Sequence, residues 1–293
     1  MTHGVFSTLP LREPYVLQDL HLAFIGGGNM ARSLIGGLVK QGCAPERITV
    51  SDPRPEQLES LADAFGICVT PDNLEAASEA DMLVFAVKPQ VLRAAAEELA
   101  DTVRSRKPLV VSIAAGIVEP DLRAWLGGEA AIVRAMPNTP ALLGAGAAGL
   151  YANPRVTPAQ KALARALLEA VGVALWIEDE SLMDAVTALS GSGPAYFFLL
   201  MEHMEAAALE LGLPADAARR LTQQTAYGAA RMALESGKAP ADLRAQVTSP
   251  GGTTAAALAV FDESKLAAIV SRALTAARDR GRQLSASAKG SKP

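Results

Sequence analysis

The chain has 293 residues, enough for two domains of roughly 150 residues each. Its composition, 50% hydrophobic and 20% charged, is that of a globular protein and excludes a disordered chain. A net charge of −4 excludes a broad basic surface for nucleic acid or an anionic membrane, and 4% aromatic residues leave few side chains for base stacking.

Cysteine and histidine are too sparse for a metal cluster. The two cysteines, Cys43 and Cys68, form no CxxC pair, and only three histidines accompany them. No metal site is expected, and free thiols are typical of a reducing compartment. Charged residues interrupt the first twenty positions, and Pro137 and Pro140 break the longest uncharged run. We therefore expect a cytoplasmic protein that neither enters a membrane nor binds nucleic acid.

The first half of the chain alternates between short apolar runs and helical segments. Residues 1–19 carry no clear period and are expected to form an N-terminal extension. Strands are predicted at residues 22–25, 48–51, 67–69, 82–87, 109–113, 131–136 and 173–177. This alternation predicts a mostly parallel sheet with helices on both faces, and hence an α/β domain over residues 20–178.

From residue 179 onward the signals are almost all helical. Apolar residues recur at helical spacing between Leu266 and Ala277. Helical segments are also predicted near residues 182–211, 215–236, 241–246 and 254–261. Residues 179–284 are therefore expected to form an all-helical domain, and the small, polar residues 285–293 a frayed tail.

A glycine-rich turn joins the first predicted strand to the following helix. Gly26, Gly28 and Ala31 match the pattern G-x-G-x-x-A. The first glycine permits the tight turn, the second lets backbone approach a pyrophosphate, and the small third residue lets the helix pack on the strand. The helix then begins with Asn29 and Met30, where free N–H groups and the helix dipole face the phosphates. This context predicts a Rossmann-like, dinucleotide-binding domain.

Two residues after the second strand point to different dinucleotides. Asp52 is placed to hydrogen-bond the ribose of NAD, whereas Arg54 is placed to pair with the 2′-phosphate of NADP. The alternative for Arg54 is a solvated surface charge, so the sequence leaves the choice open.

Two segments of the helical half are unusual for their surroundings. Residues 188–196, ALSGSGPAY, put two glycines and a proline into an apolar helical stretch, which destabilises a helix unless something compensates. Residues 247–254, VTSPGGTT, form a turn of small and hydroxyl residues ahead of a helix, where several N–H groups converge into an anion site. Taken alone, the segments are equally consistent with a helix breaker and an N-cap.

Taken in order, six motifs between residues 20 and 283 carry a specific resemblance: IGGGNMA, FAVKPQ, SIAAGI, RAMPNTP, ALSGSGPAY and VTSPGGTT. The chain resembles the Δ1-pyrroline-5-carboxylate reductase family. The resemblance implies reduction of a cyclic imine to L-proline, the last step of proline biosynthesis, with NADPH as cofactor and NADH as the other candidate. It also implies a homodimer formed by the C-terminal helices, which can assemble further into a decamer, a pentamer of dimers.

The resemblance assigns the substrate to the last motif. The Ser249 hydroxyl and the N–H groups of Gly251, Gly252 and Thr253 would hold the carboxylate, and Thr254 would bond the ring nitrogen as the catalytic residue. The alternative for Thr254 is a helix-start hydroxyl bonded to its own backbone. Because the protein only has to align the nicotinamide, hold the carboxylate and offer a hydrogen bond at nitrogen, no Cys–His or Ser–His pair is needed.

The remaining site residues come from the other motifs, and the active site is expected between the two domains. Ser190 and Gly191 are expected in the opposite wall of the substrate pocket. Asn73 is expected at the ribose, Asn138 near the nicotinamide, and Lys88 in a loop or phosphate role in preference to that of proton donor. The full set of expected cofactor contacts is Gly26, Gly28, Asn29, Met30, Asp52, Arg54, Asn73, Ala86, Val87, Lys88, Pro89 and Asn138.

Two other functions compete with this interpretation. A β-hydroxyacid dehydrogenase also pairs such an N-terminal domain with a helical one, but it relies on a lysine in a second-domain helix. Residues 181–204 contain no lysine. A dinucleotide-sensing binding protein without activity is the other alternative, and the completeness of the turn at residues 249–254 argues against it.

Overall fold

The computed structural model describes residues 16–290, with side chains described to residue 285. Residues 1–15 of the expected extension and residues 291–293 of the expected tail lie outside the described residues. The chain forms two compact units. One unit runs to Ser190 and includes the chain from Gly281 onward, and the other comprises Gly191–Arg280.

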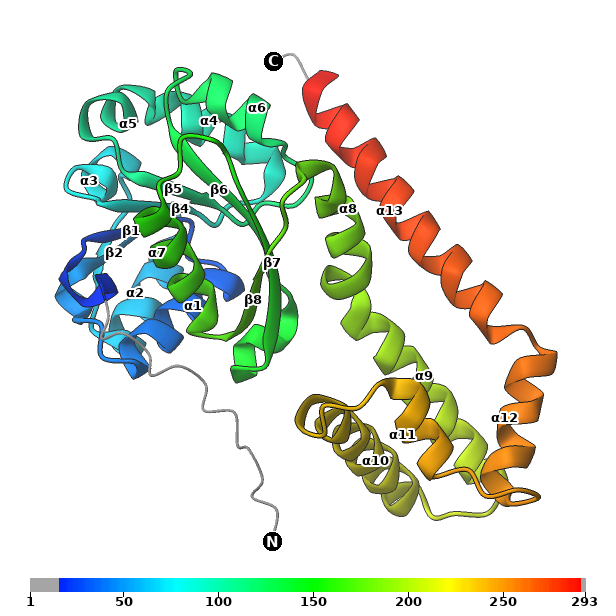
Figure 1. The fold of residues 1–293 in the computed structure, drawn as a ribbon. Helices are drawn as coiled ribbons and strands as arrows, with labels where there is room; N and C mark the ends of the chain where they lie inside the picture. Colours follow the sequence, from blue (N-terminus) through cyan, green and yellow to red (C-terminus); the bar gives the residue numbers. More distant parts are fainter. Residues whose placement is uncertain (1–15, 291–293) are drawn as a thin grey trace, which may run out of the picture. The chain divides into compact units, whose positions relative to one another are not determined.

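An eight-stranded sheet organises the first unit (Figure 1). Its strand order is β3-β2-β1-β4-β5-β6-β7-β8, and every neighbouring pair is parallel except β6 and β7. The strands are β1 (Leu22–Ile25), β2 (Ile48–Ser51), β3 (Cys68–Thr70), β4 (Met82–Phe85), β5 (Leu109–Ser112), β6 (Ala131–Met136), β7 (Gly146–Ala152) and β8 (Gly172–Trp176). The prediction of a mostly parallel sheet in an α/β fold is confirmed.

Helices cover both faces of this sheet, and a separate apolar core lies on each face. The first core packs α1 (Asn29–Lys40), α2 (Pro55–Phe65) and α7 (Pro158–Glu169) against the strands. The second core uses α3 (Asn73–Ala77), α4 (Pro89–Glu98), α5 (Ala100–Arg106) and α6 (Glu119–Trp125). Because β1 and β4 are buried along their whole length, both of their faces carry apolar side chains.

The sequence did not predict strand β7. Its residues, GAAGLYA, are mostly glycine and alanine, which carry little strand preference. The small residues are explained by packing: a Cβ on Gly149 would lie 2.6 Å from Cγ1 of Val186. The strand therefore leaves room for the helix α8 (Met183–Val186) to lie directly on the sheet.

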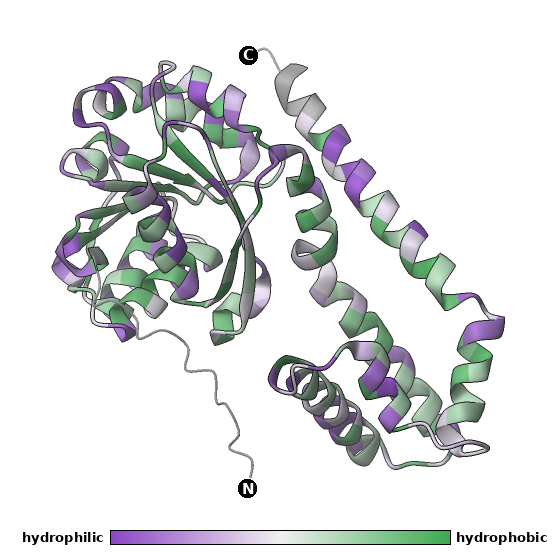
Figure 2. Cartoon of the chain, in the orientation of Figure 1, coloured by the Kyte–Doolittle hydropathy of each residue, from purple (hydrophilic) through white to green (hydrophobic). Residues whose placement is uncertain are grey.

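The second unit is entirely helical, as expected. It contains α9 (Gly193–Glu210), α10 (Ala215–Glu235), α11 (Pro240–Gln246), α12 (Thr253–Glu263) and the first part of α13 (Leu266–Gly290). Helices α9 and α12 are hydrophobic over most of their surface (Figure 2). Their exposed large apolar side chains include Phe197, Phe198, Leu199, Leu200, Val260 and Phe261. Exposed apolar surface of this extent marks an interaction site. Within residues 16–290, none of the helices combines the length and apolar character that a membrane crossing requires.

The contact between α1 and α7 gives a direct test of the packing. Gly37 is helical, where alanine would ordinarily stabilise a helix by about 1 kcal/mol, but a Cβ there would lie 2.6 Å from the carbonyl oxygen of Ala170. Gly37→Ala is therefore expected to lower the free energy of unfolding by about 1–3 kcal/mol in urea titrations. Gly36→Ala is the matched control, because its Cβ would meet only the edge of the Phe65 ring at 3.1 Å. Equal stability of the Gly37→Ala and Gly36→Ala variants would contradict this packing.

Candidate functional site

The glycine turn after β1 has the geometry of an open phosphate site. Gly26 adopts φ = 98°, and a Cβ there would lie 2.8 Å from Cγ1 of Val87. Gly28 is the N-cap of helix α1. No side chain caps the helix, and a Cβ on Gly28 would meet no atom within 4 Å. The first intrahelical bond is donated by the Arg32 N–H to Gly28 O at 2.9 Å. The N–H groups of the three residues before Arg32 are therefore left for a ligand, which fits the pyrophosphate of a dinucleotide.

Asp52 is buried beneath this turn and holds it in place. Its carboxylate accepts the Gly27 N–H at 2.9 Å and two side-chain N–H groups of Arg54, at 2.9 and 3.0 Å. Burial by itself raises the pKa of the Asp52 carboxyl, but the bonds from Arg54 and Gly27 outweigh it and lower the pKa below its ordinary value. Gln57 completes the arrangement, because its Nε2 donates to Gly27 O at 2.5 Å.

The two residues that pointed to different dinucleotides therefore form one ion pair. The Asp52 side chain is only 5% exposed, whereas that of Arg54 is 55% exposed beside the turn. Both carboxylate oxygens of Asp52 are already engaged, while the guanidinium of Arg54 keeps N–H groups free for an anion.

Asn73 lies close to the end of β2, as a ribose contact requires. Its Oδ1 accepts the Ser51 hydroxyl at 2.6 Å, and its Nδ2 donates to Glu98 Oε2 at 2.8 Å. Helix α3 is capped separately by Asp72, whose side chain accepts the N–H groups of Leu74 and Glu75. The Asn73 amide is therefore held in one orientation by groups from β2 and α4.

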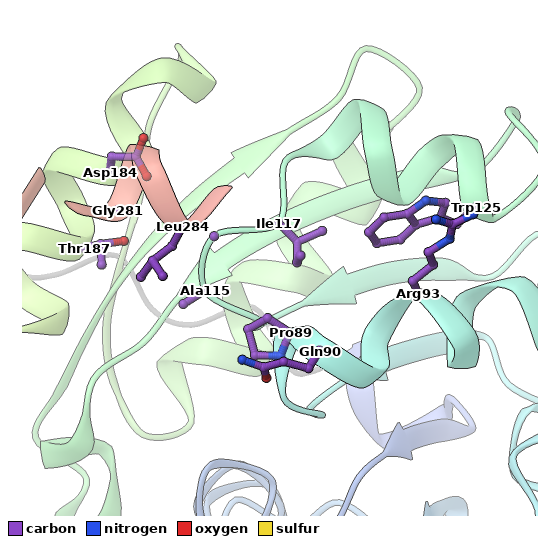
Figure 3. A pocket seen from close by; sticks show the side chains of 11 residues that line it. Pro89, Gln90, Arg93, Ala115, Ile117, Trp125, Asp184, Thr187, Gly281 and Leu284 are labelled. Atoms are coloured by element: carbon purple, nitrogen blue, oxygen red, sulfur yellow. The ribbon is translucent and has the colours of Figure 1, made fainter. Parts of the chain in front are cut away.

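The residues after β4 border a cavity of about 450 Å³. Pro89 and Gln90 form one part of its wall, and Ala115, Gly116 and Ile117, from the loop after β5, form another. Figure 3 shows Arg93 and Trp125 together at one end, with Asp184, Thr187 and Leu284 at the other. The cavity thus adjoins the carboxyl ends of two strands, where dinucleotides lie in open α/β sheets. The side chain of Lys88 is exposed.

Asn138 and Ser190, which come from two different sequence motifs, are in direct contact. Thr187–Gly191 forms a π-helical turn, a rare element that is frequent at functional sites. The Asn138 Nδ2 donates to the carbonyl of Ser190 at 3.0 Å, and its Oδ1 accepts the Ala147 N–H at 2.9 Å. The Ser190 hydroxyl donates within its own helix, to Val186 O at 2.9 Å.

In the second unit, the expected substrate turn precedes α12. Gly251, at φ = 70°, follows Pro250, and the Gly252 N–H donates to Ser249 O at 3.0 Å, which is the pattern of a type II turn. No side chain caps α12, whose first intrahelical bond is donated by Ala256 to Gly252 O at 3.1 Å. Three N–H groups thus remain available for an anion.

The hydroxyls of this turn are also unengaged. Within residues 16–285, Ser249, Thr253 and Thr254 donate no side-chain hydrogen bond, whereas Thr248 donates to Arg244 O at 2.6 Å. The Thr254 hydroxyl is therefore not bonded to its own backbone, which was the alternative role for this residue. Free N–H groups and free hydroxyls in one turn can bind a small carboxylate without a charged side chain.

The sheet and its glycine turn define a dinucleotide-binding protein of the oxidoreductase class. In agreement, a family model described as NADP oxidoreductase coenzyme F420-dependent matches residues 21–116. A second model, described as pyrroline-5-carboxylate reductase dimerisation, matches residues 180–284, where the exposed apolar helices lie. These helices therefore serve self-association.

Whole-chain relatives identify the family. A pyrroline-5-carboxylate reductase from Pseudomonas aeruginosa is 54% identical over 90% of this chain and 96% of the relative. The solved structure of a pyrroline-5-carboxylate reductase from Coxiella burnetii is similar with a TM-score of 0.88 at 45% identity, covering 90% of this chain and 98% of that one. The pyrroline carboxylate reductase of Plasmodium falciparum, solved with NADP bound, has a TM-score of 0.81 at 28% identity, over 92% and 99%. The chain belongs to the pyrroline-5-carboxylate reductase family.

Sequence reasoning missed several residues that build these sites. Gln57 and Glu98 act through partners 30 and 25 positions away along the chain, so no local pattern reveals them. The loop residues 115–117 belong to the SIAAGI motif, and the sequence pattern gives them no role in a site. Their position directly after a parallel strand was the available signal.

The buried carboxylate of Asp52 predicts a specific dependence of stability on pH. Because its folded-state pKa lies below the unfolded value of about 3.9, Asp52 stabilises the fold above that value, and the contribution is lost as the pH falls through the folded pKa. The difference in unfolding free energy between wild type and Asp52→Asn is therefore expected to stay constant above about pH 5 and to shrink below about pH 4. Asp101→Asn, which removes a carboxylate with an 89% exposed side chain, should have little effect at any pH. A pH-independent Asp52→Asn difference would contradict the assignment.

Proposed function

We propose that this chain reduces Δ1-pyrroline-5-carboxylate to L-proline with NAD(P)H, as the last step of proline biosynthesis. The observation that carries the proposal is the turn of residues 249–254. It combines uncapped N–H groups with unengaged hydroxyls in the part of the chain that matches the family's dimerisation model. Such a site suits a small ring that bears one carboxylate.

The chemistry requires little of the protein beyond binding and orientation. When bound, the dinucleotide supplies a hydride to the ring carbon of the imine. The Ser249 hydroxyl and the N–H groups of Gly251 and Thr253 hold the carboxylate. The sequence also assigned the Gly252 N–H to the carboxylate, but that N–H is bonded to Ser249 O and fixes the turn instead. The hydroxyl of Thr254 bonds the ring nitrogen, which gains a proton in the reaction. Ser190 and Gly191 form the opposite wall of the pocket, so that the ring is aligned with the nicotinamide.

The cofactor is assigned to the carboxyl edge of the sheet. The glycine turn, Asn29 and Met30 hold the pyrophosphate, Asn73 and Asp52 lie on the ribose side, and residues 86–89 with Asn138 lie toward the nicotinamide. NADPH is the preferred form. Arg54 is exposed and can pair with the 2′-phosphate, whereas the buried carboxylate of Asp52 already accepts hydrogen bonds at both oxygens and is not free for the ribose of NADH. NADH remains the second substrate of this site.

The larger organisation follows from these assignments. Residues 20–178 bind the dinucleotide, and residues 179–284 bind the substrate and form the homodimer. Five dimers can assemble into a decamer. Both cysteines are free thiols, which supports a reducing, cytoplasmic location.

The decisive experiment measures the reductase activity of the wild type and of the Thr254→Ala variant. Purified protein is mixed with pyrroline-5-carboxylate and NADPH, and cofactor oxidation is followed together with the proline formed. Wild type should turn over. Thr254→Ala should lower kcat at least about tenfold while leaving KM for NADPH nearly unchanged, because the lost hydroxyl acts on the substrate. Thr248→Ala is the matched control, since that hydroxyl is already bonded to Arg244 O. Absence of wild-type turnover overturns the function, and an equal loss of cofactor affinity overturns the role of Thr254.

Cofactor preference is tested through Arg54. Arg54→Ala is expected to raise KM for NADPH about tenfold or more and to leave KM for NADH within about twofold, because only NADPH carries the 2′-phosphate. Arg165→Ala serves as a control, since it also removes an exposed arginine paired with a carboxylate, but from α7, whose residues do not line the cavity. Equal effects of Arg54→Ala on both cofactors would show that Arg54 only supports Asp52.

A further inference from the structure

The carbonyl of Ser190 lacks its ordinary helical donor. In an α-helix, this carbonyl would accept the N–H of residue 194. Residue 194 is proline, which has no N–H and whose ring clashes with the carbonyl four residues back. The next amide, that of Ala195, donates instead to Ser192 O at 3.0 Å. The motif LSGSGP therefore leaves this carbonyl in need of a donor from another element.

Asn138 supplies that donor, and its own orientation is fixed. The Ala147 N–H can bond only to the oxygen of the Asn138 amide, which it does at 2.9 Å. This turns the nitrogen of the same amide toward Ser190 O, at 3.0 Å. Asn138 follows β6 and Ala147 lies in β7, so the sheet itself determines where the Ser190 carbonyl is held.

The segment that leads to Ser190 is attached to the sheet at its other points as well. At its start, Glu180 forms an ion pair with the buried Arg134 of β6 and accepts the Glu119 N–H at 2.6 Å. In its middle, the side chain of Val186 fills the space that a Cβ on Gly149 of β7 would need. With both of these contacts in place, the bond from Asn138 fixes the last free end of the segment.

We propose that Asn138 is a positioning residue for the reductase reaction, whose amide fixes the backbone at Ser190 and Gly191. The inference rests on the proposed function, which places these two residues in the wall of the substrate pocket. It differs from the direct nicotinamide contact that the sequence suggested for Asn138. The two roles have different kinetic consequences, because a positioning residue affects turnover and a cofactor ligand affects cofactor affinity.

The first test removes the amide. Asn138→Ala should lower kcat with pyrroline-5-carboxylate at least about fivefold, while Kd for NADPH, measured by fluorescence without substrate, should change less than about twofold. The matched control is Asn153→Ala. Asn153 also bonds main-chain groups, Ala130 O at 3.0 Å and the N–H groups of Ile132 and Arg155 at 3.2 Å, but at the opposite end of β6. Its Nδ2 also donates to Glu119 Oε1 at 2.8 Å. Asn153→Ala should lower Tm and leave kcat per folded enzyme unchanged.

A second test restores the missing bond. In the Asn138→Ala background, Pro194→Ala returns an N–H four residues after Ser190. The kcat of the double variant should be at least about twice that of Asn138→Ala. The Pro194→Ala single variant is measured as well, so that the four proteins form a double-mutant cycle. The inference is overturned if the double variant has no higher kcat than Asn138→Ala. It is also overturned if Asn138→Ala retains kcat and has a raised Kd for NADPH. Wild-type protein without turnover would instead overturn the proposed function, so the two failures are distinguishable.

Discussion

Two helices with glycine at the N-cap leave main-chain N–H groups without partners, and the proposed binding chemistry of the chain depends on them. Gly28 is the N-cap of α1 and Gly252 that of α12, and no side chain caps either helix. At such ends the first N–H groups and the helix dipole attract anions, and the absent Cβ lets a ligand reach the backbone. A dinucleotide offers a pyrophosphate and pyrroline-5-carboxylate offers a carboxylate. In the proposed function both ligands are held mainly by the main chain, which suits a chain with few aromatic residues and a net negative charge.

The residues around both helix ends keep these N–H groups without partners in the chain. Beneath α1, the buried Asp52 accepts the Gly27 N–H, and Gln57 satisfies the carbonyl of the same residue, so the turn cannot collapse onto the free N–H groups. Ahead of α12, the type II turn at Ser249–Gly252 satisfies its own backbone and leaves the hydroxyls unengaged. Hydrogen bonds within the chain thus fix both helix ends, and donors that are held in place lower the cost of binding a ligand.

The sequence predicted what depends on local pattern. Buried strands such as β1 and β4 are continuous apolar runs, and the glycine turn has the spacing of a dinucleotide site. Strand β7 escaped prediction because glycine and alanine carry little strand preference. Packing explains its glycines instead, since a Cβ on Gly149 would meet Val186 and one on Gly146 would meet Ala141 and Val171 O. The bond from Asn138 to Ser190 O joins residues 52 positions apart, which no local pattern reveals. Pro194 was the available hint, since it deprives that carbonyl of its ordinary donor.

We propose that main-chain N–H groups at the start of α12 hold the carboxylate of the substrate. The most direct measurement compares kcat/KM of the wild-type enzyme for pyrroline-5-carboxylate and for 1-pyrroline, the same ring without the carboxylate, at saturating NADPH. Several charge-assisted hydrogen bonds would be lost with 1-pyrroline, so we expect kcat/KM for 1-pyrroline to be lower by at least about a hundredfold. Values of kcat/KM within a few fold of each other would contradict it, because the turn at residues 249–254 would then have no carboxylate to hold.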